Sequence, residues 1–360
     1  MAKAKAKAKA NNKLKIFLYA FITVMTILAL FLAWTLYVLT DFTNGGPKTV
    51  DSTQDYYSIP PKPTLSTGGA EQTGEPNAEH SFYASDINKD GDNIVRVAQK
   101  DPNIINILLV GLDQSLTDNP RSRSDCMIIL SYNKAQNQAK LVSILRDSYF
   151  PVKNSGWGKL NSAMVYGGIG RTINLINRML GMDIQQYIII DFDGLAKVVD
   201  IVGGIYCPIT EAEAEYHREN SYKPEFKYDT PLEAGDHVLL DGMKAINHAR
   251  TRYLSGGDWE RTRRQRDVLY GLLNRVKEQP LSKWVDIANE ISKYIRTNAD
   301  INTIYNLGKS ALIDSSTQFD ISGVSLPFDG TWKYATIDGM SVIDLDIEEN
   351  ERQLQQLIYG

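Results

Sequence analysis

The stretch Ile104-Ile-Asn-Ile-Leu-Leu-Val-Gly-Leu-Asp113 is the clearest structural signal in the chain. Its first seven residues form an apolar run of strand length, which ends at Gly111. Two more strands are predicted over residues 126–132 and 139–145, joined by a polar turn over residues 133–138. Strands joined by so short a turn run antiparallel. These three segments predict the start of a sheet.

Helix and strand signals alternate after these strands. The predicted elements are a helix over residues 162–180 that ends at Gly181, a strand over 187–190, a helix over 195–201 closed by Gly203 and Gly204, and a strand from Ile205 onward. Strands interleaved with helices predict an α/β fold with a central mixed sheet flanked by helices. We assign this domain to residues 103–280, and we predict a helix-rich C-terminal extension over residues 281–360.

An apolar run without charge precedes the domain, over residues 16–39. About 20 such residues cross a bilayer core of roughly 30 Å, where only a helix satisfies its own backbone. The run therefore predicts one transmembrane helix. A cleaved signal peptide would have a shorter apolar region, of roughly 7–15 residues, followed by a small-residue cleavage site that this run lacks.

The residues around this run predict its orientation. Residues 1–15 contain six lysines and no acidic residue, and Asp41 follows the apolar run. By the positive-inside rule the lysine-rich tail is cytoplasmic and everything after the span is extracytoplasmic. Residues 40–102 form the predicted stalk, because their first half is rich in Gly, Pro, Ser and Thr and lacks apolar periodicity. The expected location is the cell membrane, with a single span.

The charge balance excludes a nucleic-acid surface. The chain has 39 basic and 43 acidic residues. Without the six N-terminal lysines the balance is 33 against 43, a net charge of −10. Nucleic-acid binding depends on clustered basic residues, and the cytoplasmic tail is too short to fold into a DNA-binding domain.

Cysteines and histidines exclude further classes of protein. The only cysteines are Cys126 and Cys207, so the chain is not a disulfide scaffold, although one bridge and two buried free thiols are both open alternatives. The four histidines are scattered without the spacing of zinc ligands. The sequence also has no Gly-x-Ser-x-Gly motif and no Walker-type loop.

Two carboxylates and one arginine lie at predicted strand ends. Asp113 follows the first strand, Asp125 precedes the second, and Arg146 follows the third. If the three strands are antiparallel neighbours, these side chains meet at one edge of the sheet. Paired carboxylates suit Mg²⁺, which keeps several waters and is usually completed by substrate phosphate oxygens. The alternative is that they are ordinary turn aspartates and a surface arginine.

A second group of charged residues is a cluster of arginines. Its members are Arg250, Arg252, Arg261, Arg263, Arg264 and Arg266. A helix is predicted after Gly256-Gly257, capped by Asp258, and its apolar stripe continues backwards through Arg261, Arg264 and Gln265. Arg263 and Arg266 are expected to face solvent. Buried arginines need anions, and the guanidinium fork matches phosphate oxygens, so the cluster predicts a diphosphate pocket. Internal ion pairs are the alternative.

At these residues the sequence resembles the LytR-CpsA-Psr family of cell-wall glycopolymer ligases. The order and spacing of the matching segments carry the resemblance. They are Asn106-Ile-Leu-Leu-Val-Gly-Leu-Asp113, Arg123-Ser-Asp125, Arg146-Asp147, Lys159-Leu-Asn161, Tyr166-Gly-Gly168, Asp191-Phe-Asp-Gly194, Val202-Gly-Gly204, Leu240-Asp-Gly242, Ala249-Arg-Thr-Arg252 and residues 261–265.

The resemblance implies a phosphotransferase that moves an anionic glycopolymer from an undecaprenyl diphosphate carrier to peptidoglycan. By position, Asp113 and Asp125 match the family's magnesium-associated aspartates. The residues that match its diphosphate-binding positions are Arg146, Arg250, Arg252, Arg261 and Gln265. Of these residues, Arg146, Arg250, Arg252 and Asp125 are the predicted catalytic groups. The expected cofactor is Mg²⁺, and the expected partners are the lipid-linked polymer, peptidoglycan and the membrane.

Departures from the family pattern leave some questions open. Leu145, Arg266 and His248 differ from the residues usual at their positions, each beside a matching residue. The polymer is not specified, so teichoic acid, capsule and other anionic polysaccharides are all open. The base is open between Asp125 and Asp147. Two other functions fit the same residues. One is a pyrophosphatase that hydrolyses the lipid head group, and the other is a non-catalytic regulator that binds wall polymer.

Overall fold

The computed structural model describes residue 62 and residues 93–116, 121–153, 156–220, 232–252, 254–299, 304, 308–309 and 319–360. The predicted cytoplasmic tail (1–15), the transmembrane span (16–39) and most of the predicted stalk (40–102) lie outside these residues. None of the helices in the described ranges is long and apolar enough to cross a membrane.

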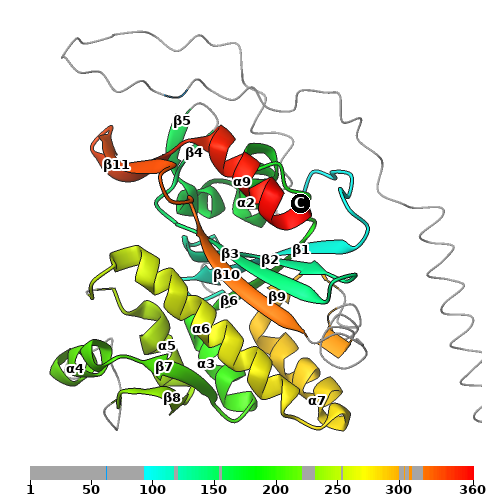
Figure 1. The fold of residues 1–360 in the computed structure, drawn as a ribbon, viewed down its shortest axis with the longest axis vertical. Coiled ribbons are helices and arrows are strands. Elements are labelled where there is room, and N and C mark those ends of the chain that lie inside the picture. The colour runs from blue at the N-terminus through cyan, green and yellow to red at the C-terminus, as the bar shows by residue number, and fades with distance from the viewer. Residues whose placement is uncertain are drawn as a thin grey trace, which may run out of the picture. The chain divides into compact units, whose positions relative to one another are not determined.

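A six-stranded sheet forms the centre of the domain (Figure 1), in the order β10-β3-β2-β1-β6-β9. Its strands are β1 (Ile104–Leu112), β2 (Ser124–Asn133), β3 (Gln138–Ile144), β6 (Gln186–Asp191), β9 (Ile295–Thr297) and β10 (Asp320–Leu326). The pairs β1–β2, β2–β3 and β6–β9 are antiparallel, whereas β1–β6 and β3–β10 are parallel. The predicted mixed sheet is therefore confirmed, as is the antiparallel order of its first three strands.

Helices cover both faces of the sheet (Figure 1). One face carries α2 (Ala163–Met179) and α9 (Ile347–Tyr359). The other carries α3 (Phe192–Ile201), α5 (Gly242–Arg250), α6 (Gly257–Lys277) and α7 (Leu281–Ile291). The remaining described elements are the strand pairs β4 (Tyr149–Lys153) with β5 (Gly156–Lys159), β7 (Ile205–Ile209) with β8 (Gly235–Leu240) and β11 (Trp332–Ile337) with β12 (Met340–Leu345), and the helices η1 (Leu160–Ser162), α4 (Glu211–Asn220) and η2 (Ser292–Tyr294).

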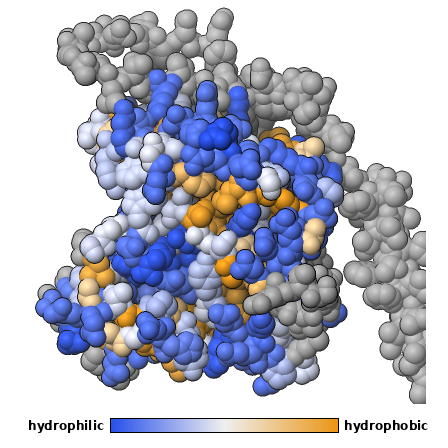
Figure 2. All heavy atoms as spheres, viewed as in Figure 1, coloured by the Kyte–Doolittle hydropathy of each residue, from blue (hydrophilic) through white to orange (hydrophobic). Residues whose placement is uncertain are grey.

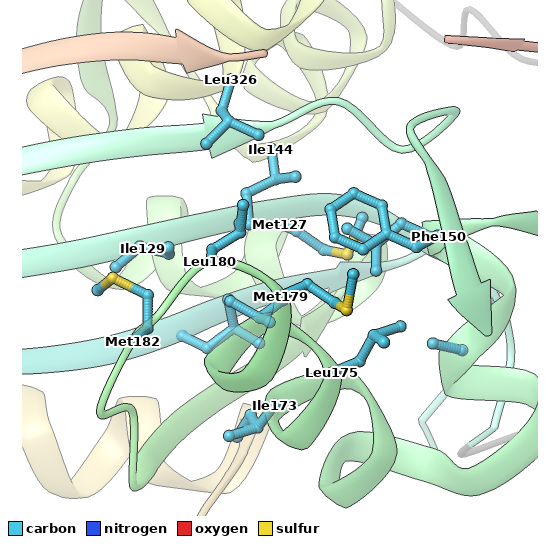
Figure 3. Close-up of a cluster of buried hydrophobic side chains, with 14 of the residues drawn as sticks. Met127, Ile129, Ile144, Phe150, Ile173, Leu175, Met179, Leu180, Met182 and Leu326 are labelled. Carbon is cyan, nitrogen blue, oxygen red and sulfur yellow. The ribbon is translucent and has the colours of Figure 1, made fainter. Parts of the chain in front are cut away.

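The larger core lies between the sheet and α2. Figure 3 shows Met127 and Ile129 of β2 and Ile144 of β3 packed toward Leu175 and Met179 of α2. Alternation along the strands sends every second side chain to this face, where the inward stripe of α2 meets them. Each such fully buried aliphatic side chain stabilises the fold by about 1.5–3 kcal/mol. A smaller core joins α3, β7, β8, α5 and α6.

The glycine-rich segment in α2 has a packing role. Gly168 has φ 68°, which breaks the regular helix, and a Cβ on Gly170 would lie 2.5 Å from the carbonyl oxygen of Asn93. The backbone around Asn93 therefore packs against the helix. Val95 N donates to Asn174 Oδ1 at 2.8 Å, which extends this contact. The predicted stalk boundary is consequently too late, because residues 93–102 belong to the folded domain.

Residues 281–360 are not the predicted helix-rich extension. They begin with α7 and end with α9, as expected, but between these helices they supply β9, β10 and the β11–β12 hairpin. Both edge strands of the central sheet come from this region. The prediction failed because these strands gain their stability from pairing with β6 and β3, which local sequence does not show.

Candidate active site

The carboxylate of Asp125 is aimed by an irregularity at the end of the first strand pair. Gly111 pairs with Cys126 and Leu112 pairs with Ser124, so Asp125 is an extra residue in β2. Such a bulge bends a strand and redirects its side chains, and bulges are common beside active sites. Asp113 follows directly after β1 on the same edge. The strand register thus places both aspartates near one another.

Arg146 joins this edge from the end of β3. Its Nη1 donates to Asp125 Oδ2 at 2.9 Å, and its Nε donates to Asp258 Oδ2 at 3.2 Å. Antiparallel pairing of β1, β2 and β3 brings these groups together, as the sequence predicted. Asp258 is an addition from α6, and it accepts the second hydrogen bond of Arg146.

Two further arginines come from the end of α5. Arg252 Nη2 donates to the same Asp125 oxygen, also at 2.9 Å. The Arg250 guanidinium lies over the Phe192 ring, 4.6 Å from its centroid, a cation–π contact that holds this arginine in place. The C-terminal end of α5 therefore directs Arg252 at Asp125 and Arg250 at Phe192, the first residue of α3.

Arg261 reaches the site from the first turns of α6 and is only 2% exposed. Its Nη2 donates to the carbonyl oxygen of Asp125 at 3.4 Å, and its Nη1 lies 3.3 Å from Asp258 Oδ1. In the described part of the chain, Nε and Nη1 of Arg261 are buried and have no hydrogen-bond acceptor. Burial, with a contribution from the nearby Arg146 and Arg252, lowers the pKa of Arg261 to about 10, although Asp258 and Asp125 act in the opposite direction. A buried cation with unused donors is costly, so this group is suited to an added anion.

A cavity of about 480 Å³ opens among these side chains. It is lined by Gly111, Asp113, Asp125, Cys126, Phe192, Tyr216, Asn247, Ala249, Arg250, Thr251, Arg252, Arg261 and Gln265. Six of the seven residues predicted for the site line this cavity, and Arg146 contacts it through Asp125. Sequence reasoning did not single out Phe192 and Tyr216 as lining residues.

Charge in the cavity favours an anionic ligand. Burial raises the pKa of Asp125, but Arg146, Arg261 and Arg252 together hold it below its usual value. The carboxylate is therefore ionised at neutral pH, where it offsets only part of the arginine charge. Clustered guanidinium groups in a partly dry pocket bind phosphate oxygens through short, charge-assisted hydrogen bonds.

Comparison with known proteins agrees with this geometry. The sequence model of the LytR_cpsA_psr family matches residues 70–358, which is most of the chain. The chain belongs to the LytR_cpsA_psr family. The match includes residues 281–358, in keeping with the strands that this region adds to the central sheet.

Two curated relatives of this chain are named as transferases. The chain is 28% identical over 261 residues to the polyisoprenyl-teichoic acid–peptidoglycan teichoic acid transferase TagU of Bacillus cereus, covering 71% of this chain and 80% of that protein. It is 26% identical over 272 residues to TagU of Bacillus licheniformis, covering 73% and 82%.

Solved structures share the fold. The crystal structure of Bacillus subtilis TagT superimposes with a TM-score of 0.59 at 20% identity, covering 75% of this chain and 98% of TagT. TagT with bound octaprenyl pyrophosphate lipid gives a TM-score of 0.56 at 21% identity, covering 76% and 98%. The arrangement of sheet and helices described above is thus that of the LytR_cpsA_psr domain.

The donor set of this LytR_cpsA_psr domain fits a magnesium ion completed by substrate. Asp113 and Asp125 both line the cavity, and Asp125 Oδ1 has no hydrogen bond within the described ranges. Those ranges contain no group of three or more His, Cys, Asp or Glu that could hold a metal. Two carboxylates with few other protein ligands suit Mg²⁺, which keeps its waters and takes phosphate oxygens. The metal role of both aspartates stays a prediction.

Two expectations for α6 were wrong. Asp258 is not the helix cap, because Gly256 occupies the cap position without a side-chain hydrogen bond and Asp258 pairs with Arg146 and Arg261 instead. Arg266 does not face solvent. It is 8% exposed, and its Nη1 donates to Ser143 Oγ at 2.7 Å and to the carbonyl oxygen of Val324 at 3.1 Å. The helix packs against the sheet as well as against α5 and β7, so more than one of its faces is buried.

Other expectations for this region are met. Arg264 is 2% exposed, and the Arg263 side chain, 37% exposed, pairs with Glu260 and Asp267. Both cysteines are free thiols, as one of the two alternatives predicted, but only Cys207 is buried, and Cys126 is half-buried at the cavity. Burial raises the pKa of each cysteine to about 12.

Proposed function

We propose that this protein transfers an anionic glycopolymer from a polyisoprenyl diphosphate carrier to peptidoglycan. The observation that supports this most directly is Arg261, buried beside the cavity with two nitrogen donors that no described residue accepts. A diphosphate would supply acceptor oxygens and negative charge at that point. The names of the relatives agree, since TagU is a teichoic acid transferase and TagT binds octaprenyl pyrophosphate.

The cavity residues divide the work of phosphoryl transfer. Arg250, Arg252 and Arg261 bind the diphosphate oxygens, and Gln265 offers an amide on the same wall. The acceptor hydroxyl oxygen forms a bond to the phosphorus next to the sugar, while the bond from that phosphorus to the bridging oxygen breaks. Polyisoprenyl monophosphate leaves. Most of the catalysis is positioning and neutralisation of phosphate charge, to which Mg²⁺ contributes when bound.

The proton of the acceptor hydroxyl needs a base. Asp125 is a weak candidate, because it accepts hydrogen bonds from Arg146 and Arg252 and its pKa is lowered. Its main role is to hold those arginines in place. Asp147 is the other candidate, and it pairs with Lys159 at 3.2 Å beside Arg146. Both carboxylates are ion-paired, and Asp125 but not Asp147 lines the cavity, so the choice of base stays open between them.

We propose an extracytoplasmic site for this reaction. Residues 16–39 would anchor the chain, with the lysine-rich residues 1–15 in the cytoplasm and the domain outside. Lipid-linked polymer and peptidoglycan would both be available there. Teichoic acid is the polymer that the relatives' names favour.

The test uses full-length protein in detergent, a lipid-diphosphate-linked oligosaccharide and peptidoglycan fragments. We expect a sugar–phosphate–peptidoglycan product that depends on Mg²⁺ and is lost in Arg146→Ala. Arg352→Ala is the matched control, because that arginine is 68% exposed on α9 and, among the described residues, pairs with Glu349 alone. Release of phosphorylated sugar without coupling would identify a pyrophosphatase instead. Tight binding without turnover would identify a non-catalytic regulator.

A further inference from the structure

Three aromatic side chains lie in a row beside the site. Trp259 of α6 and Trp332 of β11 have ring centroids 5.0 Å apart, with ring planes at 36°. Trp332 and Tyr334 are also 5.0 Å apart, edge to face at 84°. Trp259 and Trp332 are half-buried, whereas Tyr334 at the end of the row is 67% exposed.

The inner end of this row adjoins the arginine cluster. Trp259 directly follows Asp258, which pairs with both Arg146 and Arg261. Trp259 is therefore the next residue in the helix after one that pairs with two arginines of the site.

The β11–β12 hairpin, which carries Trp332 and Tyr334, is also attached to the site. Ile343 in β12 pairs with Tyr334 across the hairpin, and its N–H donates to the carbonyl oxygen of Asp147 at 2.9 Å. Asp147 follows Arg146, so the hairpin is attached to the strand end that carries this arginine. Figure 2 shows the surface hollowed into a notch between the region of the hairpin and the N-terminal end of α6, which Figure 1 places opposite each other.

A contribution to fold stability explains only some of these three aromatic residues. Contact between Trp259 and Trp332 ties the hairpin to α6, but Tyr334 leaves most of its ring in water. Large apolar side chains exposed next to a functional site are typical of binding surfaces. Aromatic rings beside a glycosyl-phosphate site suit the C–H faces of sugar rings, on which they stack.

The charge of the hairpin indicates which sugar it accepts. Residues 329–346 contain four aspartates, Asp329, Asp338, Asp344 and Asp346, and one lysine, Lys333. Asp147 and Asp258 lie at the inner edge of the same region. Asp344 pairs with Lys62 and Lys333, and Asp147 and Asp258 pair with cations of the site, so the excess negative charge of the hairpin comes from Asp329, Asp338 and Asp346. This excess disfavours a polyanionic donor polymer, whereas the sugar backbone of peptidoglycan carries no charge.

We propose that Trp259, Trp332 and Tyr334 form a stacking surface for the glycan strand of the peptidoglycan acceptor. This proposal rests on the proposed function, because it assigns one of the two substrates of that reaction. The surface would hold successive sugars and lead one hydroxyl toward the Arg146–Asp258 pair. Binding of the glycan itself does not require turnover, so the two proposals can be tested separately.

The test compares full-length wild type in detergent with Tyr334→Ala, Tyr334→Phe and Leu239→Ala. Leu239 is 50% exposed on β8, in the separate β7–β8 strand pair, and serves as the control. Tyr334 is so exposed that its removal leaves the fold intact, which a thermal melt confirms. We expect Tyr334→Ala to raise KM for peptidoglycan glycan fragments about fivefold or more. KM for the lipid-linked donor and kcat should not change, and Tyr334→Phe should behave as wild type.

The second measurement is the affinity for peptidoglycan glycan fragments, determined by calorimetric titration without metal and without the lipid-linked donor. Weaker glycan binding by Tyr334→Ala would support the stacking surface even if no transfer were ever detected, in which case only the proposed function fails. Unchanged glycan affinity and unchanged acceptor KM in this variant would overturn the proposal. A rise in donor KM alone would also overturn it, since the row would then serve the polymer.

Discussion

Replacing Asp125 by asparagine should strengthen the binding of a diphosphate in the absence of metal and weaken the binding of Mg²⁺. Asp125 Oδ2 accepts hydrogen bonds from Arg146 and Arg252, both at 2.9 Å. A diphosphate that uses the same arginine donors must compete with this carboxylate. Asparagine keeps the size and one acceptor oxygen of the side chain but removes its charge. The variant should therefore release the arginines for an incoming anion.

The size of the effect follows from the exposure of these groups. The side chains of Asp125, Arg146 and Arg252 are 15%, 17% and 40% exposed. Each contact is thus a partly exposed ion pair worth about 0.5–1 kcal/mol. Losing the competition from both is worth about 1–2 kcal/mol, or roughly 5–30-fold in Kd. We expect Asp125→Asn to bind inorganic pyrophosphate more tightly than wild type by this factor when no divalent cation is present.

Isothermal titration of full-length protein in detergent, with either EDTA or Mg²⁺, measures both sides of the prediction. With Mg²⁺ the gain should disappear, because the variant has lost a proposed metal ligand. Asp113→Asn is the matched control, since Asp113 lines the same cavity and has no ion pair with a described residue. It should lose the magnesium effect without gaining affinity in EDTA. Unchanged or weaker binding of pyrophosphate by Asp125→Asn in EDTA would refute the reasoning.

Three further predictions concern buried groups. Arg266→Ala leaves the acceptors on β3 and β10 unsatisfied, so we expect a loss of about 2–4 kcal/mol in a denaturant titration, and a loss below 0.5 kcal/mol would contradict it. Burial raises the pKa of Glu213, but hydrogen bonds from His217 and His248 lower it from 4.5 to about 2. Stability from this ionised carboxylate is complete above pH 4.5 and is lost as pH falls toward 2, and Glu213→Gln should flatten that slope in pH-dependent melts. Cys207, with its pKa raised to about 12, should resist iodoacetamide at pH 8 in native protein and react after unfolding, whereas fast native labelling would argue against its burial.

Much of the site could be predicted because its residues lie at the ends of strands joined by short connections. The turn over residues 133–138 requires antiparallel pairing, and that pairing alone brings Arg146 back to Asp125. The arginine stripe of α6 was equally readable, since helical periodicity placed Arg261 and Arg264 inward. Both inferences depend on local periodicity and one simple topological rule.

The misses share a different cause, which is pairing between distant segments. Asp258 looked like a helix cap because it stands in the first turn of α6. The helix begins one residue earlier, at Gly257, so Asp258 lies inside the first turn and pairs with Arg146, more than 100 residues away. Arg266 looked exposed because a helix is expected to bury one face, yet β10 covers a second one. Nothing local in Asp320–Leu326 predicts that it pairs with β3.

The origin of β10 also decides when the domain can fold. This strand pairs in parallel with β3, about 180 residues earlier in the chain, and α9 then completes the larger core. A nascent chain therefore carries an open edge at β3 and an uncovered core until the segment from residue 319 onward has been made. Open strand edges recruit other strands, and pairing over such separations is slow. We expect newly made protein to depend on chaperones until its synthesis ends, and a ribosome that stops before residue 319 to release an aggregation-prone product.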